Sequence, residues 1–181
     1  MDCNNIKESF KVIIAIDLQK QFKDNNGQYE KCLDYIKSHI NDCYVLGTVF
    51  YNYDDSMYEK HLNWLECKDI SLDDLSENVE YPFHKLILKS GYGLGSDNYF
   101  DFVLTEIYKI ASEKQNSESP NIEFCLIGCD ADACVLATAF TLWDKSLNFT
   151  ILSDYIYTTA EDINIDNVLT IMRRNFGDCL C

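Results

Sequence analysis

Residues 11–17 read KVIIAID, a nearly continuous run of apolar side chains that ends in the carboxylate of Asp17. Most of these side chains are β-branched, and the lack of polar alternation is typical of a strand buried on both faces, as in a parallel sheet. Four similar runs follow along the chain, at residues 44–50, 85–88, 122–127 and 149–152. The sequence therefore predicts five strands in one parallel sheet.

Longer segments between and after these strands carry apolar residues at helical spacing. They predict helices at residues 29–40, 99–111, 134–147 and 163–172. Because strands and helices alternate, we expect a single-domain, three-layer α/β/α fold with right-handed crossovers and a doubly wound parallel sheet of about six strands. The sixth strand would be short and lie at residues 179–181. No linker divides residues 1–181, which indicates one domain.

Two segments fit neither pattern. Residues 113–120, EKQNSESP, are polar and end in a proline, which is typical of a surface loop. Residues 51–80 are acidic and irregular, and we expect them to pass over one edge of the sheet with a short helix around residues 57–64. Substrate specificity would depend on this second segment, whose geometry the sequence does not reveal.

The composition limits the partners. The 181 residues include 30 acidic and 15 basic side chains, a formal charge of −15, which argues against nucleic acid or an anionic membrane surface as a partner. The first residues, MDCNNIKESF, are not a basic and then apolar signal peptide, and no early apolar run reaches the roughly 18 residues of a membrane helix. We expect a cytoplasmic protein whose partner is a small molecule.

Nine cysteines are present, and none forms the C-x-x-C pair of a zinc or thioredoxin site. In a reducing compartment most of them are expected to be small buried apolar residues, and we assign Cys125 and Cys129 to core packing. Cys179 and Cys181 would alternate on the sixth strand and be inert. At least one of the nine could be a nucleophile: Cys3, Cys32, Cys43, Cys67, Cys125, Cys129, Cys134, Cys179 or Cys181.

Three chemically suited residues stand at the carboxyl ends of predicted strands, where ligands bind in open α/β sheets. Asp17 ends the first strand, Lys89 ends the third, and Cys134 begins the helix after the fourth, within GCDADACVLATAF at residues 128–140. A helix N-terminus and a neighbouring ammonium would lower the pKa of this thiol toward neutrality. Backbone N–H groups there can bind an oxyanion, and a carboxylate can transfer the proton.

Each of these residues also has a purely structural interpretation. Taken alone, Cys134 is more readily a packed small residue, Asp17 a helix or turn cap, and Lys89 a solvated surface residue. Their occurrence together, at the ends of three strands of one sheet, favours a catalytic site.

The sequence further resembles the isochorismatase-like cysteine hydrolases, which include nicotinamidases and N-carbamoylsarcosine amidohydrolases. Residues 16–22, IDLQKQF, resemble the first motif of that family, an aspartate followed by x-Gln and then an aromatic residue. Lys89 in LKSGYG is similar to the second motif, and residues 128–139, GCDADACVLATA, are similar to the third. With the C-terminal IMRRNFG, the resemblance covers nearly the whole chain from about residue 11 onward.

The resemblance implies a hydrolase with a catalytic triad. Asp17 would be the general base and acid, Cys134 the nucleophile, and Lys89 the cation that positions Asp17 and favours the thiolate. The oxyanion hole would consist of the backbone N–H groups of Asp130 and Cys134, with a cis peptide bond between Cys129 and Asp130.

Further expectations follow for the pocket and the assembly. We expect Gln19, Phe22 and Tyr92 in the substrate pocket, whereas Phe50 and Trp64 are assigned to the core. The resemblance implies a homo-oligomer, a dimer or larger, and no cofactor.

The chain departs from the metal-binding nicotinamidases after the second strand. Those proteins have a T-x-D-x-H sequence there, whereas TVFYN at residues 48–52 puts Phe50 and Asn52 at the ligand positions. The three histidines have no ligand spacing, so we expect no metal: His39, His61 and His84.

A second departure is Asp130 followed by Ala131, where the family more often has a small apolar residue and then threonine. Two interpretations of Asp130 stay open. Its side chain adds an acceptor to the pocket and selects a substrate with a donor or a positive charge, or it points to solvent while the backbone does the work.

Together these observations predict a hydrolase that cleaves a C–N bond of a small amide or carbamoyl compound through a thioester on Cys134. A second hypothesis is isochorismatase-type hydrolysis of a vinyl ether, a reaction that does not depend on the cysteine. A third is a non-catalytic or redox-sensing binding module, suggested by the many cysteines and the missing metal ligands.

Overall fold

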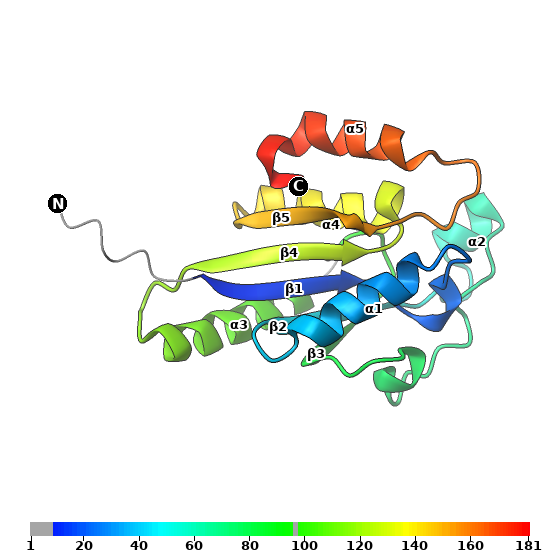
Figure 1. The fold of residues 1–181 in the computed structure, drawn as a ribbon. Coiled ribbons are helices and arrows are strands. Elements are labelled where there is room, and N and C mark those ends of the chain that lie inside the picture. The colour runs from blue at the N-terminus through cyan, green and yellow to red at the C-terminus, as the bar shows by residue number, and fades with distance from the viewer. Residues whose placement is uncertain (1–8, 96–97) are drawn as a thin grey trace.

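The computed structural model of the protein describes residues 9–95 and 98–181, in which strands and helices alternate as the sequence predicts (Figure 1). The strands are β1 Phe10–Ile16, β2 Tyr44–Phe50, β3 Lys85–Lys89, β4 Ile122–Gly128 and β5 Phe149–Ile156. The helices are α1 Gln28–His39, α2 Met57–Leu62, α3 Tyr99–Gln115, α4 Leu136–Asp144 and α5 Ile165–Phe176. None of the helices in these two ranges is long and apolar enough to cross a membrane.

The strands form one parallel sheet in the order β3-β2-β1-β4-β5, which confirms the predicted α/β class. β1 is central and pairs with β4 along its whole length, from Phe10 opposite Ile122 to Ile16 opposite Gly128. The chain adds β2 and β3 on one side of β1 and then β4 and β5 on the other. In such doubly wound sheets the ligand site lies where the order reverses, here at the carboxyl ends of β1 and β4.

The sixth strand that we predicted is reduced to a single parallel bridge between Leu180 and Ile151. Residues Gly177–Cys179 form a 3₁₀ turn instead, so Cys179 and Cys181 do not alternate along a strand. Only the last residue extends the edge of β5, because Cys181 exchanges backbone hydrogen bonds with Ile151 and Ser153.

Helices cover both faces of the sheet. On one face Ile14 and Leu126 belong to the same buried cluster as Val103 of α3, and α4 and α5 complete that layer. On the other face Ile13 packs with Ile36 of α1, which lies in front of the sheet in Figure 1. Successive β1 side chains therefore point into two separate cores, which explains why residues 11–17 show no polar alternation.

Gly128, the last residue of β4, lets this strand approach the end of β1 closely. Its φ is +110°, and a Cβ there would collide with the backbone carbonyl of Ile16. The next N–H, that of Cys129, donates to the same Ile16 carbonyl at 3.0 Å. Because residue 128 is a glycine, the ends of β1 and β4 can lie close together, just before Asp17 and the turn that carries Cys134.

The irregular segment after β2 contains less helix than predicted. α2 ends at Leu62, and a 3₁₀ turn, Leu75–Asn78, is the next helical element before β3. The segment packs on the end of β2 through a small cluster of buried side chains, which includes Phe50, Cys67 and Val79. By contrast, α3 is longer than expected and runs to Gln115, so the predicted loop begins at Asn116.

Candidate active site

Asp17 follows β1 directly and is fully buried. Its backbone is left-handed, with φ 49°, a conformation that non-glycine residues adopt rarely and often at functional sites. Thr48 on the neighbouring β2 donates from its Oγ1 to Asp17 Oδ1 at 2.5 Å and accepts the Asp17 N–H at 2.8 Å. One hydroxyl thus fixes both the backbone and one carboxylate oxygen, and the second oxygen faces Lys89.

Lys89 ends β3, is 4% exposed, and joins the other two predicted catalytic residues. Its Nζ lies 2.8 Å from Asp17 Oδ2 and donates to Cys134 Sγ at 3.3 Å. It also donates to the carbonyls of Gly91 at 3.0 Å and Tyr92 at 3.3 Å. Burial opposes the charge, but Asp17 and Cys134 outweigh it, so the pKa of Lys89 is raised. Lys89 is a fixed cation between a carboxylate and a thiol.

Cys134 lies within one π-helical turn, Ala131–Val135, rather than at the first residue of α4. The carbonyl of Asp130 accepts from the N–H groups of Ala133 and Val135, the residues on either side of Cys134. Single π turns in helices occur frequently at functional sites. The thiol is buried, with 7% exposure, and faces the cavity described below.

The peptide bond between Cys129 and Asp130 is cis, as the resemblance implies. It lies between the end of β4 and the turn that carries Cys134. The N–H of Ala131, one residue later, donates to the Tyr157 carbonyl at 2.8 Å, and Tyr157 N–H donates back to Gly128 O at 3.1 Å. The chain just after β5 therefore holds this turn on one side.

The pKa of the Cys134 thiol is raised, whereas we expected it to be lowered. Burial is the largest cause, the neighbouring Asp17 carboxylate adds to it, and Lys89 opposes both. The prediction considered the helix terminus and the ammonium, and it missed the burial of the thiol beside a carboxylate. In the resting site the proton therefore stays on the Cys134 sulfur.

A cavity of about 190 Å³ opens over Cys134. We call the rings that surround it the aromatic wall: Phe22, Phe50, Tyr58, Trp64 and Tyr92. The rest of the lining consists of Leu62, Asp130, Ala133 and Cys134. The wall rings contact one another, with Phe22 stacked on Trp64 at 6.1 Å and Tyr58 edge-on to Tyr92 at 5.0 Å between ring centroids. The Cys134 thiol thus borders an apolar, aromatic chamber.

Comparison with known proteins identifies the fold. No protein-family model and no curated protein sequence matches the chain. Among solved structures, the nicotinamidase of Bacillus subtilis is similar, with 21% identity and a TM-score of 0.65 over 94% of this chain and 98% of that one. An isochorismatase-like hydrolase from Alkaliphilus metalliredigens has 14% identity and a TM-score of 0.66 over 92% of both chains.

A third solved structure is the N-carbamoylsarcosine amidase of Thermoplasma acidophilum, with 18% identity and a TM-score of 0.63 over 94% of this chain and 95% of that one. The chain has the isochorismatase-like fold. The three sequence motifs that suggested this resemblance therefore lie in a chain with the expected arrangement of strands and helices.

Within this isochorismatase-like fold, two of the three residues predicted for the substrate pocket line the cavity and one does not. Phe22 and Tyr92 line the cavity. Gln19 does not, because its amide is bonded to the backbone of Phe50, with Oε1 accepting from Phe50 N–H at 2.6 Å and Nε2 donating to Phe50 O at 3.1 Å. Gln19 supports the aromatic wall by holding the end of β2.

The predictions for Phe50 and Trp64 need correction. Both were assigned to the core, yet both line the cavity, and Phe50 in addition packs in a buried cluster beneath it. Tyr58 on α2 is a further wall residue that the sequence did not single out. Burial raises the pKa of its hydroxyl, and the nearby Cys134 and Asp17 side chains add to that shift.

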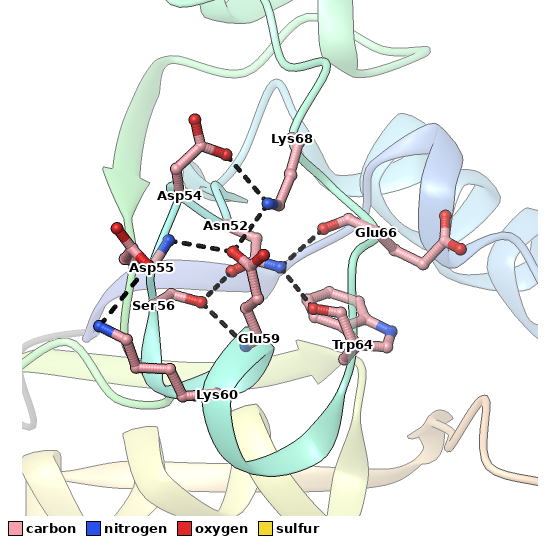
Figure 2. Close-up of polar contacts among 9 residues, drawn as sticks. All are labelled: Asn52, Asp54, Asp55, Ser56, Glu59, Lys60, Trp64, Glu66 and Lys68. Atoms are coloured by element: carbon pink, nitrogen blue, oxygen red, sulfur yellow. Dashed lines mark hydrogen bonds and ion pairs between the residues drawn. The ribbon is translucent and has the colours of Figure 1, made fainter.

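Asn52, where T-x-D-x-H has its histidine, is fully buried, and the protein itself engages its whole amide (Figure 2). Nδ2 donates to the carbonyls of Trp64 at 2.9 Å and Glu66 at 3.1 Å, and Oδ1 accepts from Ser56 Oγ at 2.5 Å. Phe50 has no ligand atom. Neither position fits a metal, and within residues 9–95 and 98–181 no cluster of His, Cys, Asp or Glu does. That the working protein needs no metal stays a prediction.

The side chain of Asp130 is bonded to the protein itself, a position that neither of the two interpretations of this residue included. The residue lines the cavity, but its Oδ1 accepts from the N–H of Thr159 at 2.6 Å and from the Thr159 hydroxyl at 2.9 Å. Burial raises the pKa of Asp130, and the two Thr159 bonds oppose that shift. The carboxylate is thus held against the chain after β5 at the rim of the cavity.

Of the other seven cysteines in the described ranges, five are buried, Cys179 is half-buried and Cys181 is exposed. Cys125 and Cys129 are buried in the core under α1, as predicted, and Cys129 Sγ donates to the Asp17 carbonyl at 3.6 Å. Burial raises the pKa of Cys125 to about 11 and that of Cys67 to about 12. Cys3 lies outside the described residues.

Proposed function

We propose that this protein is a cysteine hydrolase that cleaves a C–N bond of a small amide or carbamoyl compound through a thioester on Cys134. The observation that carries the proposal is the contact of one buried ammonium, Lys89 Nζ, with both Asp17 Oδ2 at 2.8 Å and Cys134 Sγ at 3.3 Å. This contact lies next to the aromatic cavity, whose lining is mostly apolar. Relatives in fold include proteins named nicotinamidase and N-carbamoylsarcosine amidase, which supports amide hydrolysis.

In the first half of the proposed reaction the substrate carbonyl enters the cavity above Cys134. Asp17 takes the thiol proton as Sγ attacks the carbonyl carbon, so the raised pKa of the thiol is offset by the adjacent base. The backbone N–H groups of Asp130 and Cys134 bind the oxyanion. The tetrahedral intermediate then collapses, Asp17 returns the proton to the leaving nitrogen, and ammonia or an amine departs.

In the second half a water molecule attacks the thioester carbonyl. Asp17 takes a proton from this water, the same N–H groups bind the second oxyanion, and the C–S bond breaks. The proton returns to Sγ, which restores the thiol and releases a carboxylic or carbamic acid. Throughout, Lys89 stays protonated, so its charge holds Asp17 in position and stabilises the negative charge that develops on sulfur.

The aromatic wall supports a small organic substrate rather than a polyanion. Asp130 is the one charged residue among those that line the cavity, and its charge is negative. Such a lining offers no cation to the two carboxylates of isochorismate, which disfavours vinyl ether hydrolysis. A pyruvate-release assay on isochorismate checks this, with no pyruvate expected.

The proposal is tested by a screen of small amides and ureido compounds for ammonia release. We expect turnover by the wild type and a loss of at least about 10³-fold in Cys134→Ala, because the covalent step is removed. Cys125→Ala is the matched control, since it also removes a buried thiol but lies under α1, away from the cavity. Full turnover by Cys134→Ala would rule out covalent catalysis, and a wild type that turns over no compound would favour the binding module.

A further inference from the structure

A second hollow adjoins the catalytic cavity. It has a volume of about 410 Å³ and is lined by Tyr53 before α2, by residues of α2 such as Met57 and His61, and by the loop after β3, which includes Gly91. We call it the α2 groove. Three residues line both spaces: Tyr58, Leu62 and Tyr92. The α2 groove therefore begins where the cavity over Cys134 opens to the surface.

The cavity alone is small for a ligand site. Its volume of about 190 Å³ is below the range of about 300–1,000 Å³ that is usual for pockets holding small molecules. With the α2 groove the site comes within that range. A substrate that places its reacting carbonyl over Cys134 and fills the available space must extend past Leu62 and Tyr92.

The lining of the α2 groove is mostly apolar, with His61 and Ser90 as its polar residues, although the surrounding segment is strongly charged. Five charged residues of this segment pair with one another instead: Lys68 Nζ lies 2.9 Å from Asp54 and 2.8 Å from Glu59 Oε2, and Lys60 lies 4.0 Å from Asp55 (Figure 2). None of these five residues lines the α2 groove. The helix thus keeps its charges in ion pairs and leaves its apolar side chains for the hollow.

Two of those apolar side chains are unusually open to solvent. Met57 is 63% exposed and Leu62 is 60% exposed, both lie on α2, and Leu62 also lines the cavity over Cys134. Single exposed apolar residues are ordinary, but several that converge on a hollow mark a binding surface. Bound apolar atoms would remove this surface from water.

The α2 groove is also fixed relative to the triad. On one side, the carbonyls of Gly91 and Tyr92 accept from Lys89 Nζ, the same ammonium that contacts Asp17 and Cys134. On the other side, Ser56 caps α2 by accepting from Glu59 N–H at 3.1 Å while it donates to Asn52. Hydrogen bonds therefore fix both sides of the α2 groove relative to Asp17, Lys89 and Cys134.

We propose that the substrate is an amide that carries an extended apolar chain, with the carbonyl in the aromatic cavity and the chain in the α2 groove. This inference rests on the proposed function and names the substrate class for it. The chain lies on the acyl side or on the amine side of the reacting bond, and the experiment below separates the two.

The experiment measures kcat/KM of the full chain on two series of compounds. One series lengthens the acyl side, from acetamide to octanamide, and the other lengthens the amine side, from N-methyl to N-hexyl acetamide. In one series we expect kcat/KM to rise about twofold to fourfold per methylene until the groove is filled, the gain that burial of one methylene provides. The gain should appear mainly in KM. A flat or falling profile in both series, with the short amides hydrolysed, would overturn the inference and leave the proposed function intact.

Two variants show whether the gain arises in the α2 groove. Met57→Ser should reduce the ratio of kcat/KM for the longest to that for the shortest compound. Leu72→Ser is the matched control, because Leu72 is 51% exposed in the same segment and lines neither space, and it should keep the wild-type ratio. An unchanged ratio in Met57→Ser would overturn the inference. A change of oligomeric state in Met57→Ser with the ratio unchanged would likewise overturn it and assign the groove to a subunit interface.

A binding measurement separates failure of the inference from failure of the proposed function. Octanamide, N-hexyl acetamide and acetamide are titrated calorimetrically into Cys134→Ala. If the wild type hydrolyses no amide, tighter binding of either long amide that Met57→Ser removes in this background would support the apolar site and contradict the hydrolase. Equal binding of all three amides would contradict the apolar site itself.

Discussion

The two halves of the candidate site are built in different ways. We call Asp17, Lys89 and Cys134 the triad floor: each lies at or just beyond the carboxyl end of a strand, is buried, and contacts at least one of the others. The aromatic wall comes from the last residue of β2 and from the connecting segments after β1, β2 and β3, and its rings contact one another. The sheet thus positions the three residues that are proposed to react, and the connecting segments form the walls of the cavity next to them.

This difference has an energetic side. The triad floor holds an ion pair in a water-poor environment, where either charge alone would be strongly disfavoured. The aromatic wall is held by apolar contacts and by a few hydrogen bonds to the backbone, such as those of Asn52 and Gln19. Changes to the floor should therefore affect stability and reactivity together, whereas changes to the wall should affect substrate binding first.

The largest expected effect is on the floor. Lys89→Met leaves the Asp17 carboxylate buried without its cation, so the free energy of unfolding should fall by about 3–5 kcal/mol in a urea titration. The double variant Asp17→Asn, Lys89→Met removes both charges and should recover part of that loss. A loss below about 1 kcal/mol in the single variant would mean that the pair is far more hydrated than its burial indicates.

A smaller effect is expected where the wall is attached. Asn52→Ala removes the amide that bonds the Trp64 and Glu66 carbonyls, so the free energy of unfolding should fall by about 1–3 kcal/mol. Because this loosens Trp64, KM should rise more than kcat falls. Asn148→Ala is the control, since Asn148 is an exposed residue before β5 and should leave both quantities unchanged. A fall in kcat alone would contradict the assignment of Asn52 to the wall.

A third prediction concerns the charge balance at the thiol. Asp17 raises the pKa of Cys134 and Lys89 lowers it, so Asp17→Asn should increase the thiolate fraction at pH 7.5 while it abolishes turnover. Alkylation of Cys134 by iodoacetamide should then be about tenfold faster than in the wild type, which is the effect of one pKa unit. Peptide mass spectrometry measures this rate.

Lys89→Met should have the opposite effect in the same experiment: loss of the ammonium should slow alkylation of Cys134 at the same pH. In the wild type the rate should increase as the pH rises above neutrality, since the raised pKa keeps the resting thiol protonated. Slower alkylation in Asp17→Asn would show that the carboxylate activates the resting thiol and would contradict the charge balance described here.

The triad floor could be predicted from the sequence because each member is adjacent to a strong strand signal. Asp17 ends the opening run at residues 11–17, Lys89 ends KLILK, and Cys134 follows the run at residues 122–127. Parallel strands bring their carboxyl ends to one edge, so position along the chain translates directly into proximity. The sixth strand was overestimated because CLC is too short to distinguish a strand from one bridge after a 3₁₀ turn.

The aromatic wall could not be predicted in the same way. Phe50 and Trp64 read as core residues, and their position around the cavity depends on long-range bonds, from Asn52 to the Trp64 carbonyl and from Gln19 to Phe50. No local pattern encodes those contacts. The direction of the pKa shift of Cys134 was missed for a related reason, because the burial of a side chain results from the whole fold.

The most direct test of the account is to acid-quench the wild-type protein while it turns over an amide and to determine the masses of its peptides. We predict an added mass equal to the acyl group of the substrate on Cys134 alone, removed by neutral hydroxylamine as expected of a thioester. An acyl group on another residue, or ammonia release by Cys134→Ala at the wild-type rate, would contradict the account.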